Sequence, residues 1–124
     1  MEITEFDQYR YMSLATFRKT GAEVKTPVWF AATEGKLYCF SAANAGKLKR
    51  LRNSSKARVA PCDVRGNVLG AWRDTNARIV DDKALIARVY DAFGKKYGWQ
   101  IAIFNFGARL VGKFHKRVFI EADY

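Results

Sequence analysis

Cysteine and histidine are scarce in this chain. It contains two cysteines, Cys39 and Cys62, and one histidine, His115, among 124 residues. A structural zinc site needs about four such ligands, so a single chain of this sequence cannot build one, and no metal site is predicted. Both cysteines lie in apolar runs and neither belongs to a C-x-x-C pair. We therefore interpret them as buried, reduced thiols rather than as catalytic or disulfide-forming residues.

Long hydrophobic runs are also missing. No stretch of the sequence approaches the roughly 20 apolar residues that span a bilayer, so no membrane contact is predicted. Residues 1–5 are acidic and lack the basic start and apolar centre of a signal peptide. These two absences predict a cytoplasmic location.

Recognisable catalytic machinery is missing too. The sequence has no G-x-G-x-x-G motif, no P-loop, no evident pair of catalytic carboxylates and no Ser/His/Asp or Cys/His arrangement. Asp81 and Asp82 are interpreted as a helix cap, and His115 lies in a predicted surface turn. The catalytic residues are therefore unknown, and an enzymatic activity of this chain would depend on a bound cofactor.

Positive charge, by contrast, is abundant. Twenty-two Lys and Arg face 12 Asp and Glu, which gives a formal net charge of +10 at pH 7. Such an excess favours anionic partners, among them phosphorylated cofactors, nucleic acids and acidic membrane surfaces. Aromatic residues make up 15% of the chain, which indicates either a thick barrel core or an exposed apolar groove.

Turn signals divide the chain into short strands and a few helices. Helices are predicted over residues 4–9, with Thr4 as N-cap, over 45–53 and over 82–96. Strands are predicted over residues 11–18, 23–33, 37–42, 56–64, 68–80 and 116–122, whereas residues 99–110 fit a helix and a strand equally. Short antiparallel strands with helices outside them predict a mainly β fold, a small and partly open barrel, in a single domain covering 1–124.

A basic segment follows the third predicted strand. Ser41 ends that strand, and Gly46 opens a helix whose first-turn N–H groups and positive dipole end favour an anion. Lys47 and Arg50 are three residues apart and share a helix face, and Lys49 lies on another face. A hydroxyl, backbone donors and cations at one helix start predict a phosphate site. The alternative is a solvated basic face around a core stripe of leucines.

A proline interrupts the second predicted strand at Thr26-Pro27-Val28-Trp29-Phe30. Because Pro27 has no N–H, it implies an edge, a bulge or a gap in the ladder. Neighbouring backbone groups would then be available to a flat ligand, with Trp29 or Phe30 as a wall. The alternative is an edge-strand proline beside one core aromatic residue.

A third candidate feature is the group of aromatic residues near the C-terminal end of the chain. Tyr97, Gly98 and Trp99 are followed by Phe104 and Phe106. Such a group is typical of a dimer contact or a pocket lid, and a plain core stripe fits equally well.

Taken in order, the motifs resemble those of the pyridoxamine 5'-phosphate oxidase-like split-barrel superfamily, and within it the small class of probable coenzyme F-420-dependent (deazaflavin) enzymes. The resemblance rests on YMSLATF at 11–17, Gly21, TPVWF at 26–30, LY at 37–38, GKLKRLR at 46–52, VAPCD at 59–63, Gly66 and KKYGW at 95–99. Each motif is weak alone, and the specificity lies in their order and spacing.

The resemblance implies a six-stranded split β-barrel of the flavin-reductase or FMN-binding type. It also implies a homodimer with the cofactor at the dimer interface. The implied cofactor-binding residues are Ser41, Lys47, Lys49 and Arg50 for the phosphate, and Pro27, Val28 and Trp29 for the ring.

The function that follows is hydride transfer between a flavin or deazaflavin, FMN or coenzyme F-420, and an unidentified small-molecule substrate. Positive charge at Arg65, Arg73 and Arg78 slightly favours F-420, whose tail carries more anionic groups. One alternative is a non-catalytic flavin- or anion-binding protein on the same barrel. A basic nucleic-acid-binding barrel is a further alternative. It is disfavoured because the aromatic residues fall mostly within predicted strands.

Overall fold

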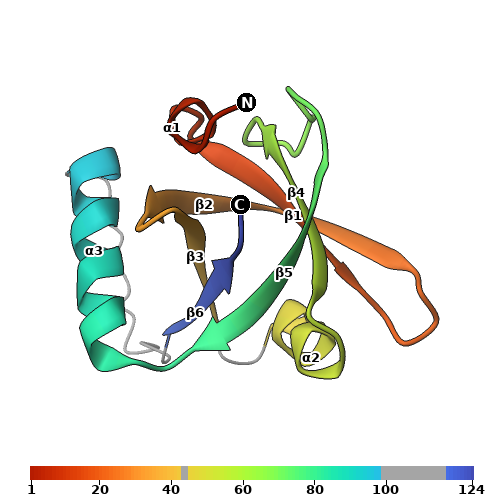
Figure 1. The fold of residues 1–124 in the computed structure, drawn as a ribbon. Coiled ribbons are helices and arrows are strands. Elements are labelled where there is room, and N and C mark those ends of the chain that lie inside the picture. Colours follow the sequence, from red (N-terminus) through yellow and green to blue (C-terminus); the bar gives the residue numbers. More distant parts are fainter. Residues whose placement is uncertain (43–44, 99–116) are drawn as a thin grey trace.

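The computed structural model describes residues 1–42, 45–98 and 117–124 and shows a six-stranded antiparallel barrel flanked by helices (Figure 1). The elements are α1 (Ile3–Phe6), β1 (Tyr11–Phe17), β2 (Glu23–Thr33), β3 (Lys36–Ala42), α2 (Gly46–Asn53), β4 (Lys56–Cys62), β5 (Arg73–Val80), α3 (Lys83–Tyr97) and β6 (Arg117–Ala122). The predicted mainly β fold and the six-stranded barrel are confirmed.

Two long strands form the corners of the barrel, whose strand order is β1-β2-β3-β6-β5-β4. Strand β2 pairs with β1 up to Trp29 and with β3 from Phe30 onward. Strand β5 pairs with β4 up to Asn76 and with β6 from Ala77 onward. Each corner strand therefore leaves one sheet and enters the other, so the two sheets share β2 and β5 and together form a closed barrel.

Alternating strand residues point inward and form the main core. The fully buried side chains there belong to Met12, Leu14, Phe30, Leu37, Cys39, Val59 and Ile120. Each large apolar side chain buried in this way contributes about 1.5–3 kcal/mol. Cys39 and Cys62 are both buried and unpaired, as predicted.

The three helices cover different parts of the barrel (Figure 1). Helix α1 lies at one end, where Phe6 enters the core, and α2 lies at the other end, where Leu48 and Leu51 do the same. Helix α3 lies outside the barrel against β2, and its Val89 and Phe93 belong to a second core. None of the described helices is long and apolar enough to cross a membrane.

Two local predictions were wrong. Thr4 lies inside α1, whose N-cap is Glu2 without a side-chain cap bond, so the acidic residues near it gave a false start signal. The predicted strand over 68–80 begins only at Arg73, because residues before it form a loop in which Val68 makes a single bridge to Cys62. The predicted cap of α3 is confirmed, since Asp82 accepts hydrogen bonds from the amides of Ala84 and Leu85, at 2.9 and 3.2 Å.

Candidate cofactor site

Strand β2 pairs with β3 only from Phe30 onward, so the backbone before Phe30 has no neighbouring strand on that side within the described residues. In the described part of the chain, β2 residues up to Trp29 pair only with β1, and Pro27 lies opposite Ser13. The missing N–H of Pro27 therefore costs no ladder hydrogen bond on the open side. Of the three predicted explanations for this proline, the structure shows an edge.

A small apolar pocket lies at this edge. Its volume is about 270 Å³, and it is lined by Tyr11, Pro27, Val28, Trp29 and Phe40. We call it the edge pocket. Three aromatic rings and a proline ring form its walls, and no carboxylate, cation or histidine is among these lining residues. Such walls suit a flat, uncharged ring system.

Trp29 is held in place by Tyr97, at the end of α3. The two rings stack with centroids 4.6 Å apart and planes inclined by 10°. The Tyr97 hydroxyl accepts from the Phe30 amide at 3.0 Å and lies 2.7 Å from the Arg10 carbonyl oxygen and 2.8 Å from that of Phe30. Burial raises the pKa of Tyr97. The predicted alternatives for this aromatic group were a dimer contact, a pocket lid or a core stripe, and Tyr97 belongs to the second core. Trp99, Phe104 and Phe106 lie outside the described residues.

Two adjoining pockets lie between the β1–β2 hairpin and α2, and together we call them the basic cleft. The first, about 350 Å³, is lined by Arg18, Lys19, Gly46, Lys49, Arg50 and Asn53. The second, about 390 Å³, shares three of these residues and adds Phe17, Gly21, Ser54 and Lys56. No carboxylate belongs to either set of described lining residues. The cleft is therefore a concentrated patch of positive charge.

Arg50 is the most constrained cation of the cleft. Its Nε donates a hydrogen bond of 2.6 Å to Oγ1 of Thr16, which is 1% exposed. A terminal nitrogen of its guanidinium lies 2.9 Å from where a Cβ on Gly46 would stand, so a larger residue at position 46 would require the Arg50 side chain to shift. Burial lowers the pKa of Arg50, and the nearby Arg18 charge adds to this. Like charges are thus held close together in the cleft.

Lys47 and Ser41 are not among the described residues that line the basic cleft. Lys47 is half-buried, and its charge acts on the thiol of Cys39, whose pKa burial raises to about 12 while Lys47 opposes the shift. Ser41 is 5% exposed and pairs with Val118 of β6. The structure therefore pairs Arg50 with Lys49 at the cleft, whereas the sequence spacing paired it with Lys47.

The predicted site residues thus fall into three groups. Pro27, Val28 and Trp29 line the edge pocket, Lys49 and Arg50 line the basic cleft, and Ser41 and Lys47 line neither. Sequence reasoning did not assign Tyr11, Phe40, Arg18, Lys19 and Lys56 to the site. Only the hairpin turn signal beside Arg18 and Lys19 could have pointed to that pair.

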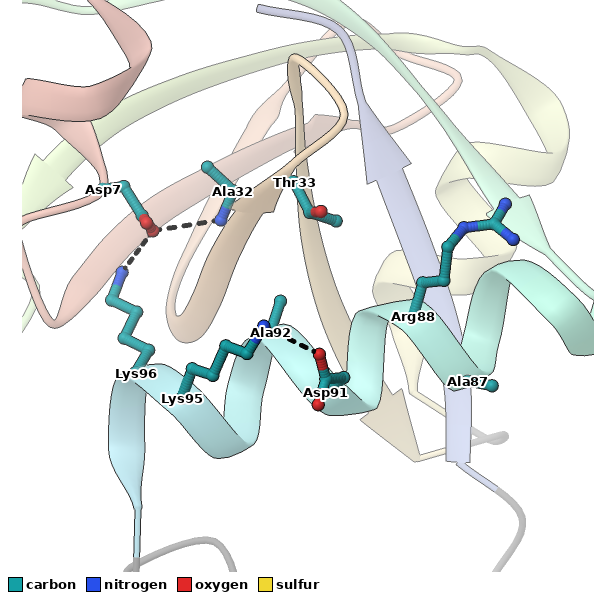
Figure 2. Close-up of a pocket in the computed structure, with 9 residues that line it drawn as sticks. All are labelled: Asp7, Ala32, Thr33, Ala87, Arg88, Asp91, Ala92, Lys95 and Lys96. Carbon is teal, nitrogen blue, oxygen red and sulfur yellow. Dashed lines mark hydrogen bonds and ion pairs between the residues drawn. The ribbon is translucent and has the colours of Figure 1, made fainter.

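A third cleft, between α3 and β2, has paired charges (Figure 2). It measures about 710 Å³ and is lined by Asp7, Ala32, Thr33, Ala87, Arg88, Asp91, Ala92, Lys95 and Lys96. We call it the α3 cleft. Lys96 lies 2.9 Å from Asp7, Lys95 lies 3.1 Å from Asp91, and Arg88 lies 3.0 Å from Glu34. Each of its three cations therefore already has a carboxylate partner.

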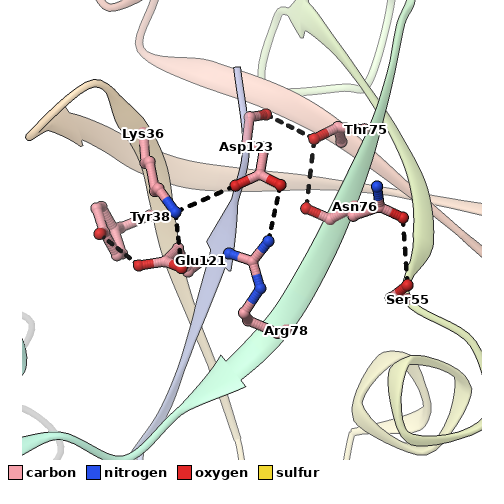
Figure 3. A network of polar contacts seen from close by, with 8 residues as sticks. All are labelled: Lys36, Tyr38, Ser55, Thr75, Asn76, Arg78, Glu121 and Asp123. Carbon is pink, nitrogen blue, oxygen red and sulfur yellow. Dashed lines mark hydrogen bonds and ion pairs between the residues drawn. The ribbon is translucent and has the colours of Figure 1, made fainter.

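The outer face of β3, β6 and β5 carries another set of paired charges, which we call the β6 network (Figure 3). Glu121 accepts a 2.6 Å hydrogen bond from the Tyr38 hydroxyl and bonds Arg78 and Lys36. Arg78 also bonds Asp123 at 2.8 Å. Arg78, predicted to favour a longer anion, is thus engaged by two carboxylates. Arg73 lies with its guanidinium carbon 3.9 Å from the ring centre of Tyr124.

Among the described residues, no group of three His, Cys, Asp or Glu forms a metal-binding cluster.

Solved structures with the same barrel fold include a protein described as a pyridoxamine 5'-phosphate oxidase and one described as FAD-binding. A Listeria innocua protein assigned provisionally as a pyridoxamine 5'-phosphate oxidase aligns with a TM-score of 0.65 and 12% identity, over 97% of this chain and 87% of its own. A FAD-binding protein of Mesorhizobium loti aligns with a TM-score of 0.61 and 16% identity, over 97% and 83%.

A heme protein has the same fold. HutZ, the heme storage protein of Vibrio cholerae, aligns with a TM-score of 0.68 and 15% identity, over 99% of this chain and 90% of its own. In sequence, the chain matches no protein-family model and no curated protein. The structural alignments establish the fold alone, because the sequence identities are low. The coenzyme F-420 class stays a prediction.

Proposed function

We propose that this protein binds a flavin-type cofactor, FMN or coenzyme F-420, and uses it as an oxidoreductase. The observation that carries the proposal is the open edge of β2. There, Pro27 lies in the stretch of β2 that pairs only with β1 among the described residues, beside a pocket walled by Trp29 and Phe40. A tricyclic ring placed in the edge pocket would stack on aromatic walls and meet the side of β2 that has no neighbouring strand within the described residues. The flavin-binding proteins with the same fold support this choice.

The phosphate of the cofactor is assigned to the cations around α2. Lys49 and Arg50 line the basic cleft, and Lys47 and Ser41 lie at the junction of β3 and α2. A hydrogen bond between a charged donor and a phosphate contributes roughly 1.5–3 kcal/mol. Together these residues would hold one end of the cofactor while the edge pocket holds the ring.

A homodimer with the cofactor at its interface is part of the proposal. The edge pocket, at about 270 Å³, is slightly smaller than the roughly 300–1,000 Å³ of typical ligand sites. A second copy of the chain would supply the missing wall. Three exposed apolar residues in the β4–β5 loop, Val64, Val68 and Leu69, provide a surface that a partner could cover.

Among the described residues that line the edge pocket, the Tyr11 hydroxyl is the one acid–base group. When bound, the cofactor would supply the hydride chemistry, and the residues of this chain would bind it, orient the ring and exclude water. The same lack of acid–base groups favours the second candidate, a flavin-binding protein without turnover. Binding of reduced cofactor that no acceptor can oxidise would support this alternative.

Titration calorimetry with FMN and with F-420 tests the proposal. We expect one of them to bind with a Kd below about 100 µM. Lys47→Ala should weaken binding by about ten-fold or more through the loss of a charged donor. Lys83→Ala, on the exposed first turn of α3, is the matched control and should leave binding unchanged. Absence of binding for both cofactors would remove the basis of the proposal.

A further inference from the structure

The basic cleft contains more cations than one phosphate can occupy. Arg18 and Lys19 come from the hairpin, Lys49 and Arg50 from α2, and Lys56 from the start of β4. Within residues 1–42, 45–98 and 117–124, the four cations other than Arg50, which bonds Thr16, form neither an ion pair nor a side-chain hydrogen bond. The cleft is therefore suited to a ligand that carries several negative charges in a row.

Two aromatic rings lie beside cations, one in the basic cleft and one next to it on the barrel surface. The Lys56 ammonium lies 4.6 Å from the ring centre of Phe17, which is half-buried and lines the cleft. The half-buried ring of Trp72 has the Lys25 ammonium at 5.2 Å and the Arg58 guanidinium carbon at 4.8 Å. Neither Phe17 nor Trp72 belongs to the two core clusters.

The strand register places the two rings on the same outer face. Ala15 of β1 lies opposite both Lys25 of β2 and Arg58 of β4, the residues that flank Trp72. Phe17 is two residues further along β1, about 7 Å away. Two acids also lie on this face. Glu23 is engaged by Lys25 at 3.4 Å and by Arg58 at 3.0 Å, and Asp74, which lies opposite Arg58, is engaged by Arg58 at 3.4 Å. Rings and cations therefore alternate over β2, β1 and β4 and continue into the cleft.

We propose that this surface binds single-stranded nucleic acid, with phosphates in the basic cleft and bases against Phe17 and Trp72. A positive groove beside aromatic platforms is how β-barrel proteins bind single strands without sequence preference. Other polyanions offer no bases to the rings, and a duplex keeps its bases stacked. The sequence disfavoured this function because aromatic residues fell within strands, but Phe17 and Trp72 lie outside the core.

This activity goes beyond the proposed cofactor function and uses residues of its own. Lys49 and Arg50 are shared with the phosphate assignment, whereas Phe17, Lys19 and Lys56 are not. Lys47→Ala is accordingly expected to weaken cofactor binding and to leave nucleic-acid binding intact. The two proposals can therefore fail separately.

The test is fluorescence anisotropy of a labelled oligothymidylate of about 12 nucleotides, within the site size of such barrels. Binding should be measurable at about 50 mM salt and weaken steeply by about 200 mM. Five phosphate contacts predict a slope of log affinity against log salt of about −3.5. No binding at about 100 µM protein in low salt would overturn the proposal.

Two variants locate the surface. Lys19→Ser with Lys56→Ser should reduce the slope to about −2.1 and leave FMN or F-420 affinity unchanged. Lys83→Ser with Lys95→Ser changes the net charge equally on α3, at two exposed positions, and should leave the slope unchanged. Equal effects of the two double variants, or a loss of cofactor affinity in the first, would overturn the proposal.

The aromatic contribution is tested with Phe17→Leu, which keeps an apolar side chain and removes the ring. Oligothymidylate affinity should fall about five-fold with the salt slope unchanged, which corresponds to the lower end of base stacking. A heparin fragment, which has charge but no bases, should bind the variant and the wild-type protein equally. If the oligothymidylate also binds both equally, the surface is a general polyanion site and the proposal is wrong.

Discussion

The basic cleft and the β6 network contain the same kinds of cation in opposite states. In the network, Lys36 and Arg78 are held by the carboxylates of Glu121 and Asp123. In the cleft, no described acid partners the cations, and two arginines lie close enough to affect each other's charge. The net charge of +10 is therefore distributed unevenly. Cations of the first kind stabilise the fold, and those of the second kind are available to a ligand.

The α3 cleft extends the comparison, because its pocket is larger than either pocket of the basic cleft and its cations are all paired. Volume alone would select it as the binding site. An anion entering it would have to displace a carboxylate from each cation, and the same anion meets no such competition in the basic cleft. The distinction between the regions lies in pairing rather than in size or number of cations.

The largest change in stability is expected from Glu121→Gln, which removes a central carboxylate of the β6 network. The substitution keeps the shape of the side chain but removes the charge that binds Arg78 and accepts from the buried Tyr38 hydroxyl. We expect a loss of about 2 kcal/mol in the free energy of unfolding, measured in urea. Glu34→Gln, in the exposed pair with Arg88, is the control and should cost less than about 1 kcal/mol. Equal losses would contradict the assigned role of the network.

Acidification should produce a smaller effect on the same network. Burial raises the pKa of Glu121, but hydrogen bonds from Tyr38 and Arg78, with the charges of Lys36 and Arg78, lower it overall. A carboxyl with a lowered folded-state pKa stabilises the fold above its unfolded value and loses this contribution as pH falls through the folded value. The free energy of unfolding should therefore decrease below about pH 4.5, and less so in Glu121→Gln. Identical pH profiles of the two proteins would refute this.

The smallest effect is expected in the basic cleft. Arg18→Ser removes one of two neighbouring guanidinium groups and no ion pair within the described structure. The free energy of unfolding should stay the same or rise by a few tenths of a kcal/mol at low salt. Thermal unfolding at low and high salt measures this. A clear loss of stability would show that Arg18 has a structural partner and belongs with the paired cations.

The sequence predicted the strands well because local signals determine them. Turn residues such as Gly21 and Gly35 bound β1, β2 and β3. The lack of an N–H at Pro27 implied an edge, a bulge or a gap in the ladder, and the structure shows an edge. The wrong start of α1 and the shortened β5 are failures of the same local signals. Acidic residues near Thr4 resemble a cap, and the apolar residues near Val68 resemble a strand although they lie in a loop.

The candidate sites could be predicted only in part because they depend on long-range pairing. Phe17 and Lys56 meet through the β1–β4 ladder, 39 positions apart in the numbering. Trp29 and Tyr97 meet through the packing of α3 on β2. The helical spacing of Lys47 and Arg50 was read correctly, but which face of α2 would meet the hairpin depends on how Leu48 and Leu51 enter the barrel.

The central claim is that the cations of the basic cleft are available to anions, whereas those of the β6 network and of the α3 cleft are not. An NMR titration of the backbone amides with inorganic pyrophosphate tests it most directly. The account predicts shifts concentrated at residues 18–21 and 46–56, with the amides of Arg78, Arg88 and Lys96 unchanged. Shifts spread evenly over paired and unpaired cations, or the absence of shifts in the cleft, would contradict it.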